Sequence, residues 1–214
     1  MSSTGNKLLL KVIILGNASV GKTSLLYQYV KNQFSQQYKA TIGADFLTKN
    51  IQKGEDTLQL QIWDTAGTER YNSMGQNFYR HSEACVLVFD LTVKDSFTSI
   101  DNWRKEFLAA LGPKDPDNFP FVLVGNKSDM KDDIKVTNEE IQAYCKEHNN
   151  MPYFATSAKE DIGLEETFNK VADLAYERVT KNEDNFVPKK PTYLDIRNIS
   201  NEPKKKGCCG GKNN

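Results

Sequence analysis

Four short and almost continuous apolar runs are the feature that most constrains how this chain can fold. They are LLLKVIILG (8–16), CVLVFD (85–90), FVLVGNK (121–127) and PYFATS (152–157). Runs of this length, rich in branched and aromatic residues, are typical of strands buried on both faces, as in a parallel sheet. Patterns with helical spacing separate the runs, near residues 22–32, 95–111, 137–149 and 164–180.

One further apolar pattern alternates strictly, in TLQLQIW (57–63), and the turn-like segment KGED precedes it. Together with ADFLTKNIQ (44–52) it predicts a β-hairpin. We therefore expect an α/β fold with an open, mostly parallel sheet that has one antiparallel strand and helices on both faces. In such sheets ligands bind at the carboxyl ends of the strands.

The composition excludes some functions. The 214 residues include 28 Lys and Arg against 28 Asp and Glu, so the net charge provides no general attraction to nucleic acid. No apolar stretch reaches the roughly 18 residues of a membrane-spanning helix. The N-terminal MSSTGNK is not expected to be a secretory signal. Cys85 lies in the apolar run CVLVFD and Cys145 in a helical pattern, and both are expected to be buried in a reduced, cytosolic protein.

The expected organisation is one domain over residues 8–180, with an N-terminal extension (1–7) before it. Residues 181–214 have no amphipathic period and are rich in Asn, Lys, Pro and Gly, which predicts a flexible tail.

The segment GNASVGKT (16–23) matches the phosphate-loop pattern and lies between a predicted strand and a predicted helix. Glycines in such a loop let backbone N–H groups face phosphate oxygens, and the helix N-terminus adds positive potential. The predicted nucleotide contacts here are Ser19, Val20, Gly21, Lys22, Thr23 and Ser24. Lys22 would bridge the β- and γ-phosphates and Thr23 would bind Mg²⁺. A plain glycine-rich turn with a solvated lysine is the simpler alternative, which the flanking strand and helix disfavour.

Two further strand ends carry NKSD (126–129) and TSAK (156–159). The Asp129 carboxylate can accept two hydrogen bonds from N1–H and the exocyclic amine of guanine, a pair that adenine does not offer. The Ala158 N–H could bind the guanine carbonyl. The predicted guanine contacts are Asn126, Lys127, Asp129, Ser157, Ala158 and Lys159. These motifs disfavour a phosphate-loop kinase that uses ATP.

With these motifs the chain resembles the small GTPases of the Ras superfamily over about residues 8–180. It resembles the Rab family in IGADF (42–46), LQIW (60–63), RYNSMG (70–75), FYRHSE (78–83) and VFDLT (88–92). The segments YKATIGADFLTK, DPDNFPFVLVGNK and NNMPYFATSAKE are similar to the late-endosomal Rab seven branch. The resemblance implies the six-stranded G-domain fold of phosphate-loop NTPases, with GTP and GDP as substrate and product and Mg²⁺ as cofactor.

The resemblance also implies roles for single residues. Thr41 would reach Mg²⁺ and the γ-phosphate, and Asp64 would lie near the metal. Phe34 would stack on the purine and Gly67 would contact the γ-phosphate. Tyr38 is also a nucleotide contact by this resemblance. The implied catalytic group is Lys22, Thr41, Gly67 and Thr68.

Three aromatic residues, Phe46, Trp63 and Tyr79, match the triad that Rab effectors contact, although core packing would equally explain them. The resemblance implies further partners: an exchange factor, a GTPase-activating protein, a prenylation escort and a GDP-dissociation inhibitor. It implies a monomer that binds no nucleic acid and lies on late endosomal, lysosomal or phagosomal membranes.

Two positions depart from the family pattern. Thr68 follows DTAG, where the family usually has a glutamine that orients the attacking water. Threonine is shorter and β-branched, so it does not easily reach the same place. Ala18 adds a methyl group where glycine or serine is usual. We expect slow GTP hydrolysis; the alternative is a binding module that stays loaded with GTP.

The C-terminal segment EPKKKGCC joins a basic run to two cysteines, Cys208 and Cys209. A lipid anchor beside a polybasic segment is a common two-signal route to membranes, and related Rab proteins are prenylated on such cysteines. GGKNN follows them here and does not form a C-a-a-X box. The alternative is a pair of exposed thiols.

Overall fold

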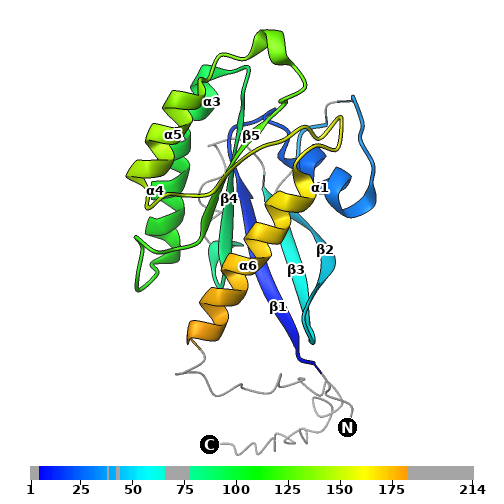
Figure 1. Cartoon of the computed structure of the whole chain (residues 1–214), viewed down its shortest axis with the longest axis vertical. Coiled ribbons are helices and arrows are strands. Elements are labelled where there is room, and N and C mark those ends of the chain that lie inside the picture. Colours follow the sequence, from blue (N-terminus) through cyan, green and yellow to red (C-terminus); the bar gives the residue numbers. More distant parts are fainter. Residues whose placement is uncertain (1–4, 38, 42–43, 66–77, 183–214) are drawn as a thin grey trace, which may run out of the picture.

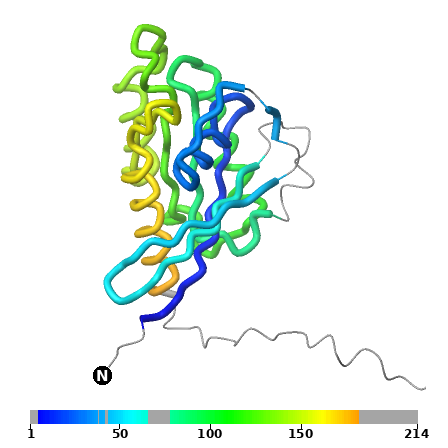
Figure 2. The backbone as a smooth tube through the Cα atoms, turned by 90° about the vertical axis from the view of Figure 1, so that its right-hand side faces the viewer, coloured from blue at the N-terminus to red at the C-terminus, as the bar shows by residue number. Residues whose placement is uncertain are grey.

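The fold is described from a computed structural model, which covers residues 5–37, 39–41, 44–65 and 78–182. A six-stranded sheet has the strand order β2-β3-β1-β4-β5-β6, and only the β2–β3 pair is antiparallel (Figures 1 and 2). The strands are β1 (Lys7–Leu15), β2 (Ala44–Lys53), β3 (Asp56–Thr65), β4 (Ala84–Asp90), β5 (Phe121–Asn126) and β6 (Tyr153–Ala155). This architecture confirms the predicted fold class.

Helices follow β1, β4, β5 and β6 along the chain. They are α1 (Lys22–Lys31), α3 (Lys94–Thr98), α4 (Ile100–Leu111), α5 (Asn138–Glu147) and α6 (Leu164–Asn182), with a 3₁₀ turn η2 (Lys131–Asp133). α1 and α6 cover one face of the sheet, whereas α4 and α5 cover the other (Figure 1). Among the helices of the described ranges, none is long and apolar enough to cross a membrane.

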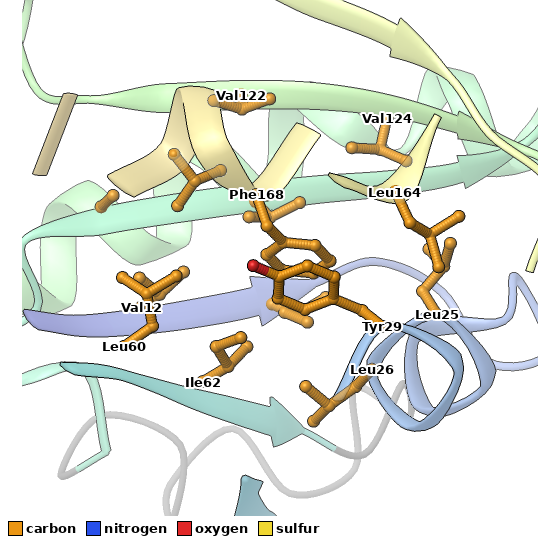
Figure 3. Close-up of a cluster of buried hydrophobic side chains, with 14 of the residues drawn as sticks. Val12, Leu25, Leu26, Tyr29, Leu60, Ile62, Val122, Val124, Leu164 and Phe168 are labelled. Carbon is orange, nitrogen blue, oxygen red and sulfur yellow. The ribbon is translucent and has the colours of Figure 1, made fainter. Parts of the chain in front are cut away.

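Alternate residues of β1 belong to two separate apolar clusters, one on each face of the sheet. Val12 and Ile14 pack toward α1 and α6, while Ile13 and Leu15 pack toward α4 and α5. In the first cluster Tyr29 of α1 stacks on Phe168 of α6, with ring centroids 4.1 Å apart (Figure 3). Burial on both faces explains why the β1 sequence is almost continuously apolar.

The predicted helix over 95–111 is two helices, α3 and α4, which meet at Ser99. The hydroxyl groups of Thr98 and Ser99 both donate to the carbonyl of Asp95, at 3.0 and 2.7 Å. The backbone N–H of Ser99 also donates to this carbonyl, at 3.1 Å, and side-chain bonds of this kind often bend a helix. The predicted burial of Cys85 and Cys145 is confirmed.

The carboxyl ends of β1, β4, β5 and β6 lie along the upper edge of the sheet in Figure 1. Asp90 at the end of β4 pairs in register with Asn126 at the end of β5, and Gly125 pairs with Ala155 of β6. The loops that carry the three sequence motifs therefore begin at the same edge of the sheet, those of NKSD and TSAK on neighbouring strands.

Candidate functional site

The loop between β1 and α1 depends on two glycines that no other residue could easily replace. Gly16 has φ +147°, and an added Cβ would lie 2.1 Å from the carbonyl oxygen of Val88 in β4. Gly21 has φ +97°, and an added Cβ would lie 2.3 Å from Nδ2 of Asn126. Ser19 between them also has a positive φ, +66°. The loop is therefore wound tightly against the ends of β4 and β5.

Lys22, the first residue of α1, lies beneath this loop with only 6% of its surface exposed. Its Nζ donates to the carbonyl oxygens of Gly16 and Asn17, at 2.7 and 2.9 Å. Burial lowers the pKa of Lys22 to about 8, and the charge of Asp64 partly opposes that shift. An ammonium has three N–H donors, so one N–H is left for an anion at the loop.

A group of oxygen atoms lies beside Lys22. Thr23 Oγ1 donates to Asp64 Oδ2 at 2.5 Å, and Thr41 Oγ1 lies 2.9 Å from Thr23 Oγ1 and 3.4 Å from Asp64 Oδ2. The predicted metal residues are thus in mutual contact.

The environment of the Asp64 carboxylate indicates whether this group of oxygen atoms could bind a cation. It is 2% exposed, and within the described ranges its Oδ1 is buried without a hydrogen-bond partner. Burial is the main cause that raises the pKa of Asp64, against the hydrogen bonds from the two threonines and the charge of Lys22. A bound cation would compensate this carboxylate, and hydroxyl and carboxylate oxygens are the ligands that Mg²⁺ prefers. The residues therefore fit Mg²⁺.

Asn126 joins the three motif loops. Its Nδ2 donates to the carbonyl oxygen of Val20 in the phosphate loop at 2.8 Å. Its Oδ1 accepts from the Ala158 N–H at 3.3 Å and from Thr156 Oγ1 at 3.4 Å. One side chain, 2% exposed, thus connects segments that are more than a hundred residues apart in the chain.

Asp129 is held in place by the loop that follows β6. Its Oδ1 accepts from Ser157 Oγ at 2.6 Å, and Lys159 Nζ lies 4.0 Å from its Oδ2. Lys127 has φ +66°, and its Nζ lies 2.6 Å from Asp90 Oδ2. The structure thus brings together the predicted residues of NKSD and TSAK.

Other predicted site residues lie at the surface or outside the described residues. Phe34 is 39% exposed, and Ser19 and Ala18 are exposed on the phosphate loop. Ser24 is partly buried in the first turn of α1. Five predicted residues lie outside the described ranges: Tyr38, Gly67, Thr68, Cys208 and Cys209.

The three aromatic residues of the predicted effector triad lie in different environments. Phe46 is 43% exposed and stacks on Trp63 across the β2–β3 pair, with centroids 5.0 Å apart. Tyr79 is 7% exposed and packs against Phe107 of α4, at 5.2 Å. Core packing therefore describes Tyr79, whereas Phe46 presents much of its ring to solvent.

Two contacts of the loops were not anticipated from the sequence. Asn17 Oδ1 accepts from Trp103 Nε1 at 2.7 Å, and Asn17 Nδ2 donates to Ser99 Oγ at 3.2 Å, which ties the phosphate loop to α4. Asp90 binds Lys127, as described above. The carboxylate at the end of the apolar run CVLVFD could have indicated that Asp90 lies near the site. No local sequence pattern indicates that Trp103 contacts the phosphate loop.

Replacing Trp103 by phenylalanine should loosen the phosphate loop because Asn17 loses its indole donor. A neutral hydrogen bond contributes about 1 kcal/mol, so we expect nucleotide dissociation to become about fivefold faster. Stopped-flow release of a fluorescent GDP measures this rate. Phe107→Leu is the control, since it opens space in the same apolar cluster without touching the loop. Equal acceleration in both variants would contradict a role for the Asn17 bond.

Comparisons with known proteins identify the family of the chain. The Ras family model matches residues 11–177. The chain is 49% identical to the Ras-related protein Rab-7a of Dictyostelium discoideum over 207 residues, which covers 97% of the chain and all of that protein. It is 49% identical to the Ras-related protein Rab7 of Pisum sativum (94% and 96% covered) and 48% identical to the GTP-binding protein yptV5 of Volvox carteri (97% and 100%). The chain therefore belongs to the Ras family, as a small GTPase of the Rab7 type.

Proposed function

We propose that this protein is a GTP-dependent switch that binds GTP or GDP with Mg²⁺ and regulates vesicle traffic to late endosomes, lysosomes or phagosomes. The main observation in support of a nucleotide site is the position of Asn126, whose amide joins the phosphate loop to the loop of Ala158. Through it, the two ends of a guanine nucleotide would be held by one connected set of loops.

In this proposal each residue has a distinct task. Lys22 binds the β- and γ-phosphates, and the loop amides around it bind the remaining phosphate oxygens. Thr23 and Thr41 would hold Mg²⁺, with Asp64 acting on the ion through water, and the bound ion would neutralise phosphate charge. Asp129 selects guanine through two hydrogen bonds, with its carboxylate oriented by Ser157.

The same contacts would transmit the nucleotide state. Thr41 lies in an irregular segment between α1 and β2, and its hydroxyl lies beside Thr23 and Asp64. In the proposal Thr41 and Gly67 both contact the γ-phosphate, so hydrolysis releases both of their segments together. Effectors would bind the GTP form through the face that includes Phe46 and Trp63, while exchange and activating factors would control the cycle. The protein would act as a monomer.

Membrane attachment is proposed through Cys208 and Cys209. A basic run directly before them would add electrostatic attraction to an anionic lipid surface. A prenylation escort and a GDP-dissociation inhibitor would be needed to deliver and remove such an anchor.

Hydrolysis is proposed to be slow because of Thr68, with Ala18 as a second hindrance. The alternative, a module that stays loaded with GTP, differs only in whether a partner can supply the missing water-positioning group. Rab GTPase-activating proteins that provide both an arginine and a glutamine would make Thr68 tolerable.

Replacing Thr68 by glutamine is expected to speed intrinsic GTP hydrolysis about tenfold, because a water-positioning contact contributes on the order of 1–3 kcal/mol. Single-turnover hydrolysis with Mg²⁺ measures the rate, with and without a Rab-type activating domain. If the protein is a switch, the wild type with the activating domain should hydrolyse GTP as fast as the Thr68→Gln variant with the same domain.

Ala18→Gly is the matched control for the second departure. If neither Thr68→Gln nor the activating domain speeds hydrolysis, the GTP-loaded module becomes the better account. An increase with Ala18→Gly alone would then assign the defect to the phosphate loop.

A further inference from the structure

Asp90 is a buried carboxylate to which the family motifs assign no role. It is the last residue of β4 and is 3% exposed. Its two oxygens have separate partners. Oδ1 accepts from the backbone N–H and the hydroxyl of Thr92, at 2.8 and 2.7 Å, whereas Oδ2 lies 2.6 Å from Lys127 Nζ. The first oxygen closes a local turn, and the second reaches a residue of another strand-end loop.

Lys127 is fixed at both ends of its side chain. Its backbone follows directly after β5 and has φ +66°, a conformation that residues other than glycine rarely adopt. Its ammonium is bound by Asp90, whose Cα is in register with Asn126, the neighbour of Lys127. A free lysine side chain samples many rotamers, but this one is confined to the space between the ends of β4 and β5.

The burial of the two partners differs. The Asp90 side chain is 4% exposed and the Lys127 side chain is 34% exposed. The carboxylate therefore forms a fixed, buried anchor, and the lysine stem extends from the anchor to the surface of the guanine loop. Asn126 and Asp129, two other residues of that loop, are held separately by the phosphate loop and by Ser157.

We infer that Asp90 is a positioning residue for the bound nucleotide: it holds the Lys127 ammonium so that the methylene stem lies against the planar base and slows nucleotide release. The inference rests on the guanine site proposed above. Asp90 acts only through Lys127 in this account. A carboxylate is required because an amide at the same place would present a donor to the ammonium or leave it unpaired.

The structure also offers a competing role, in which Asp90 only shapes the turn through Thr92. The two roles use different oxygens, so they are separable. Asp90→Asn keeps an oxygen for Thr92 and removes the charge opposite Lys127. Thr92→Val keeps the Lys127 pair and removes one hydrogen bond of the turn.

The test is a double-mutant cycle on the release of fluorescent GDP from the Mg²⁺-bound protein. Asp90→Asn is expected to release GDP about tenfold faster, since the Lys127 ammonium loses the charged partner that holds it in place. Lys127→Met should release it at least as fast, and the double variant no faster than Lys127→Met alone. Thr92→Val should change release less than about twofold while lowering the thermal midpoint.

The inference is overturned if Asp90→Asn releases GDP like the wild type, or accelerates release by the same factor in the Lys127→Met background. An acceleration by Thr92→Val equal to that of Asp90→Asn would assign the effect to the turn. Asp90→Ser repeats the cycle if the asparagine variant does not fold, since serine offers an oxygen to Thr92 and no charge to Lys127. A wild type that fails to bind guanine nucleotide at all would instead refute the proposed function.

Discussion

Replacing Lys22 by methionine is expected to weaken nucleotide binding by about 10- to 100-fold, since a charge-assisted hydrogen bond contributes about 1.5–3 kcal/mol and Lys22 has one N–H left for phosphate. Methionine fills a similar volume and carries no charge. The buried ammonium is costly in the free protein, as its lowered pKa indicates. The nucleotide-free variant should therefore be at least as stable as the wild type, although its affinity is lost.

Equilibrium titration with fluorescent GDP and thermal unfolding of nucleotide-free protein check the two halves of this expectation. Lys31→Met is the matched control, because Lys31 is the last residue of the same helix and its Nζ lies over the ring of Tyr27. The control should keep wild-type affinity. Retained affinity in Lys22→Met would refute the assignment of the phosphate site.

Gly21→Ala is expected to disconnect the phosphate loop from the guanine loops. The new Cβ would lie 2.3 Å from Asn126 Nδ2, the atom that donates to Val20, and φ +97° disfavours any residue with a Cβ. Asn126 must move, and its contact with the Ala158 N–H moves with it. We expect affinity for GDP to fall about 100-fold, because both ends of the site lose their alignment.

Gly112→Ala is the control that has the backbone strain of a positive φ without a steric clash of the added Cβ. Gly112 ends α4 with φ +60°, and nothing lies within 4 Å of an added Cβ. This variant should lose about 1 kcal/mol of stability from strain and keep its affinity for GDP. Similar losses of affinity in the two variants would show that strain alone, and not contact with Asn126, explains the result.

Local pattern was sufficient for most of the secondary structure. The run 8–16 corresponds to β1 at 7–15, and the pattern 137–149 to α5 at 138–147, where Thr137 and Glu140 form a capping box. Periodicity and capping depend on residues that are close together in the chain, so they can be recognised from the sequence. The bend at Ser99, where the hydroxyl groups of Thr98 and Ser99 bind the carbonyl of Asp95, was missed because apolar spacing continues through it.

The motif residues were also predictable, since a phosphate loop requires its glycines and lysine in one short segment. The contacts between motifs were not. Trp103 and Asn17 are 86 residues apart, and Asp90 meets Lys127 only because β4 lies beside β5 in the sheet. The environment of Tyr79 likewise depended on the position of α4.

The sequence by itself determined most of the strands and helices, the phosphate loop, the guanine-specific motifs and thus the family, because each depends on residues close together in the chain. Only the tertiary structure decided which side chains join the loops. It placed Asn126 between Val20 and Ala158, and it placed Asp90 opposite Lys127. Strand order and register set those distances, and neither can be computed from a local pattern of apolar and polar residues.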